Sequence, residues 1–217
     1  RFSEEEIIHL FYDKFYQIPL LKRMDAVMEY FIDSYETLKG RNIEEEDREF
    51  LQRKFDKMYV TKDIYAIYNK LLAVCGQEQM AELPHERRKI QYEDVFPMLY
   101  VKYRLTGKNE HKNIKHLVID EMQDYSYLQY LILKELFDCK MTILGDRAQT
   151  LGKEQQDVLK FLPKVFGKNI RTVILNKSYR NTREIADYAG KIANVKDIEF
   201  LDRHGKDVAE RKFKTDE

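Results

Sequence analysis

The sequence predicts an α/β protein, in which a helical first part is followed by alternating strands and helices of a parallel sheet. Apolar residues recur at helical spacing over residues 1–88, which indicates amphipathic helices. From Leu117 onward, short continuous apolar runs end abruptly in polar residues, which is typical of buried parallel strands. Strands that alternate with helices form an open sheet with helices on its faces.

The composition allows a folded core and excludes several classes of protein. Of the 217 residues, 43% are hydrophobic, and the 38 basic and 38 acidic side chains cancel. Bulk charge therefore indicates no nucleic-acid or membrane partner, and any phosphate-binding function must be local. The two cysteines exclude a disulfide scaffold and a four-cysteine zinc site, and they favour a reducing, cytoplasmic compartment. No apolar run approaches the roughly 20 residues of a membrane span.

Five helices are expected in the first half of the chain. They lie at 3–19, 20–39, 50–58, 64–75 and 93–105. Ser3 and Glu6 form a capping box for the first helix, and Gly40 is a natural stop for the second. Pro97 should be tolerable only in the first turn of the fifth helix. The aromatic residues at helical spacing favour a hydrophobic core over a base-stacking surface.

Strands and helices alternate after residue 107. The expected strands lie at 117–119, 141–144, 172–175 and 198–201, with helices near 126–136, 158–165 and 181–192 between them. The first three strands end in polar clusters at 120–124, 145–149 and 176–180. Because the carboxyl ends of parallel strands share one edge of a sheet, we expect these clusters to converge on one ligand.

The first cluster, Asp120 and Glu121, suits phosphoryl transfer. A carboxylate at a strand tip can hold Mg²⁺, while its neighbour polarises a water molecule for attack on a phosphoryl group. Gln149 could sense a terminal phosphate, Arg180 could bind it bidentately, and the ring of Tyr179 could stack on a nucleobase. Each feature alone has an ordinary explanation as a helix cap, a turn or a surface ion pair. Their order at three strand ends favours the functional interpretation.

Three motifs resemble those of the UvrD/Rep-type superfamily 1 helicases. Residues 118–124, Val-Ile-Asp-Glu-Met-Gln-Asp, resemble motif II, whose usual form is apolar-apolar-Asp-Glu-Ala-Gln-Asp. Residues 142–149, Thr-Ile-Leu-Gly-Asp-Arg-Ala-Gln, look like motif III. Residues 175–182, which contain Ser-Tyr-Arg-Asn-Thr, look like motif IV. The resemblance spans 91–203 and implies part of a RecA-like P-loop ATPase core.

The resemblance also implies a domain organisation and cofactors. Residues 1–88 would form a helical 1B-like subdomain, 89–167 the second half of core domain 1A, and 168–217 the start of core domain 2A. ATP and Mg²⁺ would be the cofactors, and single-stranded DNA or another nucleic acid the partner.

Roles for individual residues follow from the same resemblance. Asp120 would bind Mg²⁺, and Glu121 would be the catalytic base. Gln149 would contact the γ-phosphate and couple it to nucleic-acid binding. Tyr179 would stack on the adenine, and Arg180 would contact the γ-phosphate.

Other positions of the motifs are less typical. Gln123 and Asp124 are expected to join the motifs to one another instead of taking part in the chemistry. Met122 stands where motif II usually has Ala, and residues 150–153 lack the aromatic residue that usually follows motif III and stacks on a DNA base. Residues 99–105, 177–180 and 203–205 resemble the HelD-type branch of the family, which implies RNA polymerase as an alternative partner.

A phosphate-binding loop of the form Gly-x-x-x-x-Gly-Lys-Ser/Thr does not occur in the sequence. Gly107-Lys108 lacks the upstream glycine. The chain opens on Arg1 instead of Met, and we therefore expect an internal fragment of an ATP-driven motor that is inactive by itself, with the loop encoded upstream.

Two other functions compete with the motor. One is a non-catalytic docking module with a helicase-like fold that binds nucleic acid or RNA polymerase. Retention of Asp120, Glu121, Gln149 and Arg180 argues against it. The other, which is less favoured, is a Mg²⁺-dependent phosphatase or nuclease that uses Asp120, Glu121 and Asp124.

Overall fold

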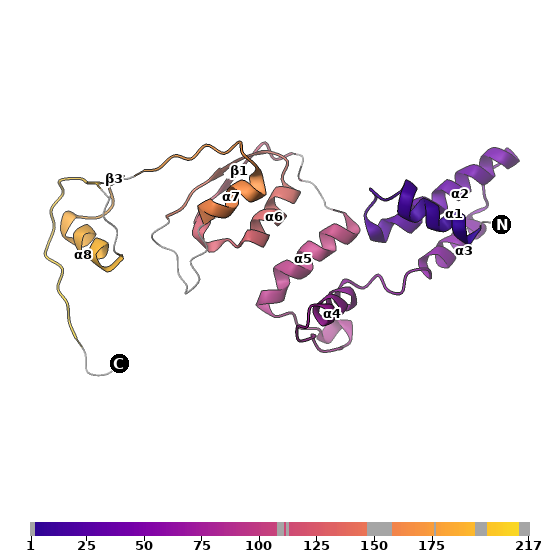
Figure 1. Ribbon diagram of the computed structural model, residues 1–217, viewed down its shortest axis with the longest axis horizontal. Helices are drawn as coiled ribbons and strands as arrows, with labels where there is room; N and C mark the ends of the chain where they lie inside the picture. The colour runs from indigo at the N-terminus through magenta and orange to yellow at the C-terminus, as the bar shows by residue number, and fades with distance from the viewer. Residues whose placement is uncertain are drawn as a thin grey trace. The chain divides into compact units, whose positions relative to one another are not determined.

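The computed structural model describes residues 3–107, 111, 113–146, 158–175, 177–193 and 199–212 (Figure 1). The chain divides into two compact units, one of residues 1–117 with 128–140 and the other of residues 118–127 with 141–217. Helices dominate, and the short strands come after residue 115, which agrees with the predicted α/β class.

All five helices predicted for the first half are present. They are α1 (Glu4–His9) with its π-helical continuation η1 (Leu10–Lys14), the turn η2 (Leu20–Lys22) leading into α2 (Arg23–Lys39), α3 (Glu45–Asp56), α4 (Ile64–Val74) and α5 (Tyr92–Thr106). The capping box is confirmed, since the Ser3 hydroxyl accepts from the Glu6 N–H and the Glu6 carboxylate accepts from the Ser3 N–H, both at 3.1 Å. Gly40 ends α2 with a left-handed φ of 66°.

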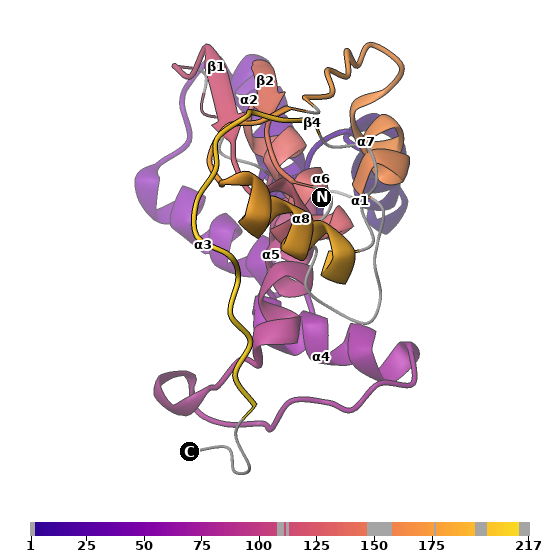
Figure 2. The ribbon, with the colours of Figure 1, turned by 90° about the vertical axis from the view of Figure 1, so that its left-hand side faces the viewer.

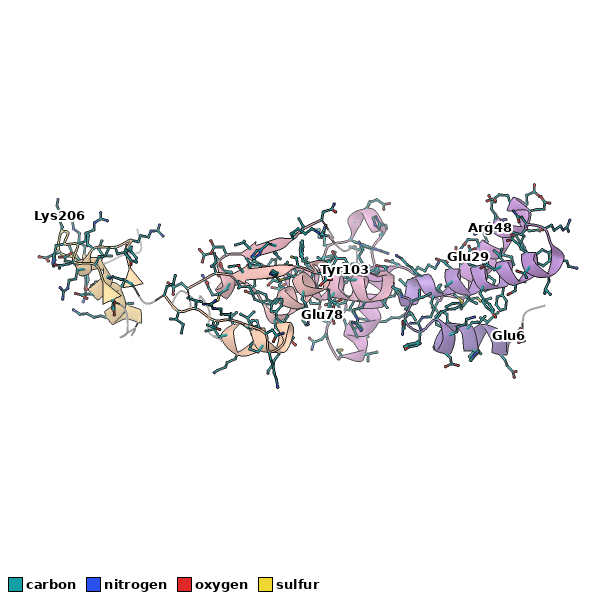
Figure 3. All side chains as sticks on the ribbon, turned by 90° about the horizontal axis from the view of Figure 1, so that it is seen from above. Glu6, Glu29, Arg48, Glu78, Tyr103 and Lys206 are labelled. Atoms are coloured by element: carbon teal, nitrogen blue, oxygen red, sulfur yellow. The ribbon has the colours of Figure 1, made fainter. Side chains whose placement is uncertain are left out.

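The helices α1, η1, α2 and α3 enclose one hydrophobic core. Its buried members are Leu10, Phe11, Val27, Met28, Phe31, Ile32 and Phe55. Phe11, Phe31 and Phe55 agree with the prediction that rings at helical spacing form core, whereas Phe50 of α3 is 57% exposed. At the surface, Arg48 of α3 pairs with Glu29 of α2, and both side chains are labelled in Figure 3.

Side-chain hydrogen bonds from α4 hold the segment of residues 77–88, which connects α4 to α5. The buried Asn69 side chain donates through Nδ2 to the Met80 carbonyl and accepts through Oδ1 from the Met80 N–H, both at 2.8 Å. The Tyr65 hydroxyl donates to the Ala81 carbonyl at 2.8 Å. The link is therefore ordered by α4, although its sequence predicts only a loop.

Pro97 lies deeper in α5 than expected. Since α5 begins at Tyr92, Pro97 is beyond the first turn, and the Glu93 carbonyl receives no bond from its missing N–H. The expected first-turn position was wrong because a tertiary contact stabilises the start of the helix. The buried Tyr68 hydroxyl donates to Asp94 Oδ1 at 2.8 Å. Burial and the Asp94 carboxylate raise the pKa of Tyr68 to about 12.

The second half contains short strands with helices between them. Its elements are β1 (His116–Ile119), η4 (Met122–Asp124), α6 (Tyr127–Leu136), β2 (Lys140–Ile143), α7 (Val158–Phe166), β3 (Lys177–Ser178), α8 (Arg183–Ala193) and β4 (Glu199–Phe200). The strands β1 and β2 form one pair, and both are labelled in Figure 2. The strands β3 and β4 form a second, parallel pair, with Lys177 opposite Glu199.

The strand expected at 172–175 is absent from the described structure. Val173, Ile174 and Leu175 are 67%, 80% and 89% exposed, and no ladder pairs with them. A strand without a hydrogen-bonded neighbour is not stable by itself, so the apolar run alone does not form one. The pairing starts later, at Lys177, and in the described residues the expected single sheet is replaced by two separate pairs.

Hydrogen bonds connect the segment after β4 to the start of α8. His204 Nδ1 lies 2.8 Å from Glu184 Oε1, and His204 Nε2 lies 3.1 Å from Asp202 Oδ1. The Gly205 N–H donates to Glu184 Oε2 at 2.8 Å. The hydrogen bond from His204 lowers the pKa of Glu184 to about 2, and the Glu184 and Asp202 carboxylates raise the pKa of His204 above its usual 6.5.

Replacing Asn69 should destabilise the helical unit, because Asn69→Ala leaves the N–H and carbonyl of Met80 without their partners. We expect a loss of about 1–3 kcal/mol in the free energy of unfolding, measured by urea denaturation. Gln79→Ala is the matched control, since exposed Gln79 donates one hydrogen bond to the Asn69 carbonyl. Equal losses in the two variants would contradict the role given to Asn69.

The contact between α8 and the segment after β4 should depend on pH. The raised pKa of His204 means that its protonated form stabilises the fold. This contribution to stability is complete below the unfolded-state pKa of 6.5, and it is lost as pH rises through the higher pKa of His204 in the folded protein. The opposite holds for Glu184, whose contribution is present above its unfolded pKa of 4.5 and is lost as pH falls towards 2.

Hydrogen exchange of the α8 amides should therefore accelerate, after correction for intrinsic rates, as pH rises above 6.5. The dependence should disappear in His204→Gln. A wild-type protection that stays constant across this range would show that the His204 contacts do not stabilise α8.

Candidate functional site

Asp120 and Glu121 lie directly beyond β1, at the edge that β1 shares with β2. The Leu144 N–H donates to the carbonyl of buried Ile119 at 2.8 Å, and the Leu144 carbonyl accepts from the Met122 N–H at 2.9 Å. Ile119 is the last residue of β1, and Leu144 directly follows the last residue of β2. The ends of β1 and β2 therefore meet at one edge, as predicted for the first two polar clusters.

Glu121 has an uncommon backbone conformation. Its φ of 52° and ψ of 51° are left-handed, and it is the one non-glycine residue with positive φ in the described part of the chain. For a residue with a Cβ this conformation costs about 1–2 kcal/mol. Its N–H donates to Asp120 Oδ1 at 2.9 Å, and both side chains are exposed. Strain of this kind clusters at functional sites.

The side chain of Gln123 joins the loops that follow β1 and β2. Its Nε2 donates to Glu121 Oε2 at 2.6 Å, and its Oε1 accepts from the Asp146 N–H at 3.2 Å. This is the connecting role expected of Gln123. Asp124 contributes through its backbone, because its N–H donates to the Glu121 carbonyl at 2.9 Å and closes the turn of η4.

Gly145 is required by close packing against the loop after β1. A Cβ at this position would lie 2.4 Å from Met122 Cγ and 2.7 Å from both Gln123 Oε1 and the Met122 backbone nitrogen. Met122 is buried and occupies the space beside the glycine. The sequence suggested only a turn at Gly145-Asp146. A glycine directly after a strand was the signal that could have indicated a close approach.

The described contacts of Asp120 and Glu121 do not include Tyr179 or Arg180. Tyr179 and Arg180 lie between β3 and α8, and both are exposed. Among the described residues, no hydrogen bond or ion pair joins them to Asp120 or Glu121. Gln149 lies outside the described residues. The roles of Gln149, Tyr179 and Arg180 therefore stay predictions.

The chemistry of Asp120 and Glu121 fits a magnesium ion held together with a phosphate ligand. Mg²⁺ prefers oxygen ligands, keeps several waters and is usually bound by one or two carboxylates plus substrate phosphates. Two adjacent, exposed carboxylates at a strand end meet this requirement. Both carboxylates accept one hydrogen bond, Asp120 from the Glu121 N–H and Glu121 from Gln123, so the choice of Asp120 for the metal rests on its place in the motif.

Two substitutions at Glu121 should separate backbone strain from loss of the carboxylate. Both Glu121→Gly and Glu121→Ala remove the hydrogen bond with Gln123, but only glycine adopts the left-handed conformation without penalty. We expect Glu121→Gly to be more stable than Glu121→Ala by about 1 kcal/mol, measured by chemical denaturation. An alanine variant as stable as the glycine variant would show that the backbone here is not strained.

Comparison with known proteins assigns the chain to a family. The model of the UvrD/REP helicase N-terminal domain matches residues 4–151, a range that begins in α1 and includes Asp120, Glu121, Gln123 and Gly145. Tyr179 and Arg180 lie beyond it. No match was found among curated proteins. No helix in the described ranges has the length and apolar character needed to cross a membrane. Because the match covers more than half of its length, the chain belongs to the UvrD/REP helicase family.

Proposed function

We propose that the chain is part of an ATP-dependent superfamily 1 helicase or translocase, which couples ATP hydrolysis to remodelling of nucleic acid or of a complex with RNA polymerase. Family membership supports a helicase-type function. The observation that carries the proposal further is the strained Glu121, whose carboxylate is held by Gln123 at the shared edge of β1 and β2.

In this proposal Asp120 holds Mg²⁺ and Glu121 is the general base. The ion, when bound with ATP, neutralises charge on the phosphates. The Gln123 amide holds Glu121 Oε2, so the carboxylate keeps one orientation while Oε1 accepts a proton from the attacking water. The Asp146 N–H in turn holds Gln123 Oε1, which couples the loop after β2 to the position of the base.

The remaining assignments rest on the order of the motifs. Gln149 contacts the γ-phosphate and links it to nucleic-acid binding, Tyr179 stacks on the adenine, and Arg180 contacts the γ-phosphate. The proposed parts are a 1B-like subdomain at 1–88, the second half of a RecA-like domain 1A at 89–167, and the start of domain 2A at 168–217. The exposed positions of Tyr179 and Arg180 are compatible with binding to a nucleotide.

A docking module without catalysis is the second candidate, because no Gly-x-x-x-x-Gly-Lys-Ser/Thr loop occurs in the 217 residues. Such a loop supplies the backbone N–H groups and the lysine that hold the phosphates. The conformation of Glu121 favours the motor instead, since a docking surface has no need of a strained carboxylate.

An ATPase assay tests the assignment. Without a phosphate-binding loop, the 217-residue chain with Mg²⁺, ATP and single-stranded DNA should show no turnover above that of its Glu121→Gln variant. In a protein that joins this chain to such a loop, Glu121→Gln should lower kcat about 100-fold or more, with little change in KM for ATP.

Asp124→Asn provides the control in the same assay, because the described contact of Asp124 at the site is made by its backbone. Turnover by the chain alone that Glu121→Gln abolishes would show that the chain is active by itself. Unchanged kcat in the longer protein would exclude Glu121 as the base.

A further inference from the structure

The turn that carries Tyr179 and Arg180 is held at both ends by residues 199–205, which we call the anchor segment. Before the turn, β3 forms its parallel pair with β4, the first part of this segment. After the turn, the Arg183 N–H donates to the Arg203 carbonyl at 2.9 Å. The turn lies between β3 and α8, both labelled in Figure 1, and the side chains of Tyr179 and Arg180 are exposed. One short stretch of chain therefore fixes both ends of the turn.

Close packing and two hydrogen bonds join the anchor segment to the start of α8. The Glu184 carboxylate accepts from the Gly205 N–H at 2.8 Å and lies 2.8 Å from His204 Nδ1. Gly205 leaves no room for a side chain, because a Cβ there would lie 2.8 Å from Thr182 Cγ2 and 3.2 Å from Thr182 Cβ. Displacement of the anchor segment would therefore move the residues that directly follow the turn.

The His204 ring lies between two carboxylates, with Nδ1 2.8 Å from Glu184 and Nε2 3.1 Å from Asp202. A neutral imidazole has one N–H and can donate to only one of them, whereas an imidazolium can donate to both. These hydrogen bonds raise the pKa of His204 above its usual 6.5. The complete contact therefore requires the protonated ring.

Arg183 is a further charged group at this contact. Its Nη1 lies 3.9 Å from Asp202 Oδ1, and its Nε lies 4.0 Å from Asp187 Oδ2. An arginine keeps its charge at every physiological pH. Asp202 therefore retains a cationic neighbour when His204 loses its proton, and deprotonation acts chiefly on the contact between His204 and Glu184.

We propose that Glu184 and His204 are positioning residues, which hold the turn of Tyr179 and Arg180 in the geometry that receives a nucleotide, and that protonation of His204 regulates this fit. The inference rests on the proposed function, in which Arg180 contacts the γ-phosphate, and adds a regulation of that contact. Arg180 is two residues before Thr182, so its backbone lies within about 7 Å of the packed contact.

The preference for a triphosphate over a diphosphate tests the proposal. In a protein that joins this chain to a phosphate-binding loop, isothermal titration calorimetry gives the affinities for ADP and for a non-hydrolysable ATP analogue. At about pH 6, His204→Gln should reduce the preference for the ATP analogue by about two- to fivefold, the range of an exposed ion pair. At about pH 9, the wild type should fall to the value of this variant.

His204→Arg provides a permanent cation that can still donate to both carboxylates. It should keep the preference of the wild type at about pH 6 and retain it at about pH 9. Comparison of the variants at the same pH removes the effect of ionisation of the nucleotide itself. A wild type that matches His204→Arg at both pH values would overturn the regulation by protonation.

Lys206→Gln is the matched control, because it removes a positive charge from the next exposed side chain after Gly205, labelled in Figure 3. It should keep the preference of the wild type. Arg180→Ala should lower the preference, and His204→Gln should add nothing in that background, since the contact it positions is already absent.

The outcomes separate this inference from the proposed function. No effect of Arg180→Ala, or no binding of either nucleotide, would overturn both. An effect of Arg180→Ala without one of His204→Gln would overturn the inference alone. Equal loss of ADP and ATP-analogue binding in His204→Gln would show a purely structural contact. An equal effect of Lys206→Gln would show that charge in general, not this contact, is responsible.

Discussion

The candidate site depends on the two hydrogen bonds by which Leu144 connects β2 to both sides of Asp120 and Glu121. These bonds align the ends of two strands that are separated in the sequence by α6, and they leave the two carboxylates between them. Gly145 allows the loops to approach closely, and the Gln123 amide connects them at the level of side chains. A displacement of β2 would therefore move Gln123 and, with it, the Glu121 carboxylate.

The chain contains a well-packed hydrophobic cluster and also a run of exposed apolar residues. The helices α1 to α3 bury a cluster that includes four apolar side chains of α2, those of Val27, Met28, Phe31 and Ile32. In contrast, the run from Val173 to Leu175 is exposed and unpaired in the described structure. Exposed runs of this kind usually mark surfaces that contact another segment or partner.

The edge after β1 and β2 and the start of α8 use different kinds of interaction. The edge after β1 and β2 presents carboxylates, which suit a metal and a triphosphate. The contact of His204 with Glu184 and Asp202 holds the start of α8, which lies shortly after Tyr179 and Arg180 in the chain.

The sequence by itself determined the features that depend on neighbouring residues. The five helices of the first half, the capping box of Ser3 and the left-handed stop at Gly40 follow from local spacing and backbone preference, so they could be predicted. The same holds for Asp120 and Glu121 at the end of a strand, because the motif and the apolar run are contiguous. The tertiary structure decided what depends on distant partners: the start of α5 before Pro97, the pairing at Lys177 instead of 172–175, and the close contact of Gly145 with Met122. Strand pairing and side-chain hydrogen bonds such as those of Gln123 join residues that are far apart in the chain. The residues next to each partner in the sequence therefore do not show which distant residue it will contact.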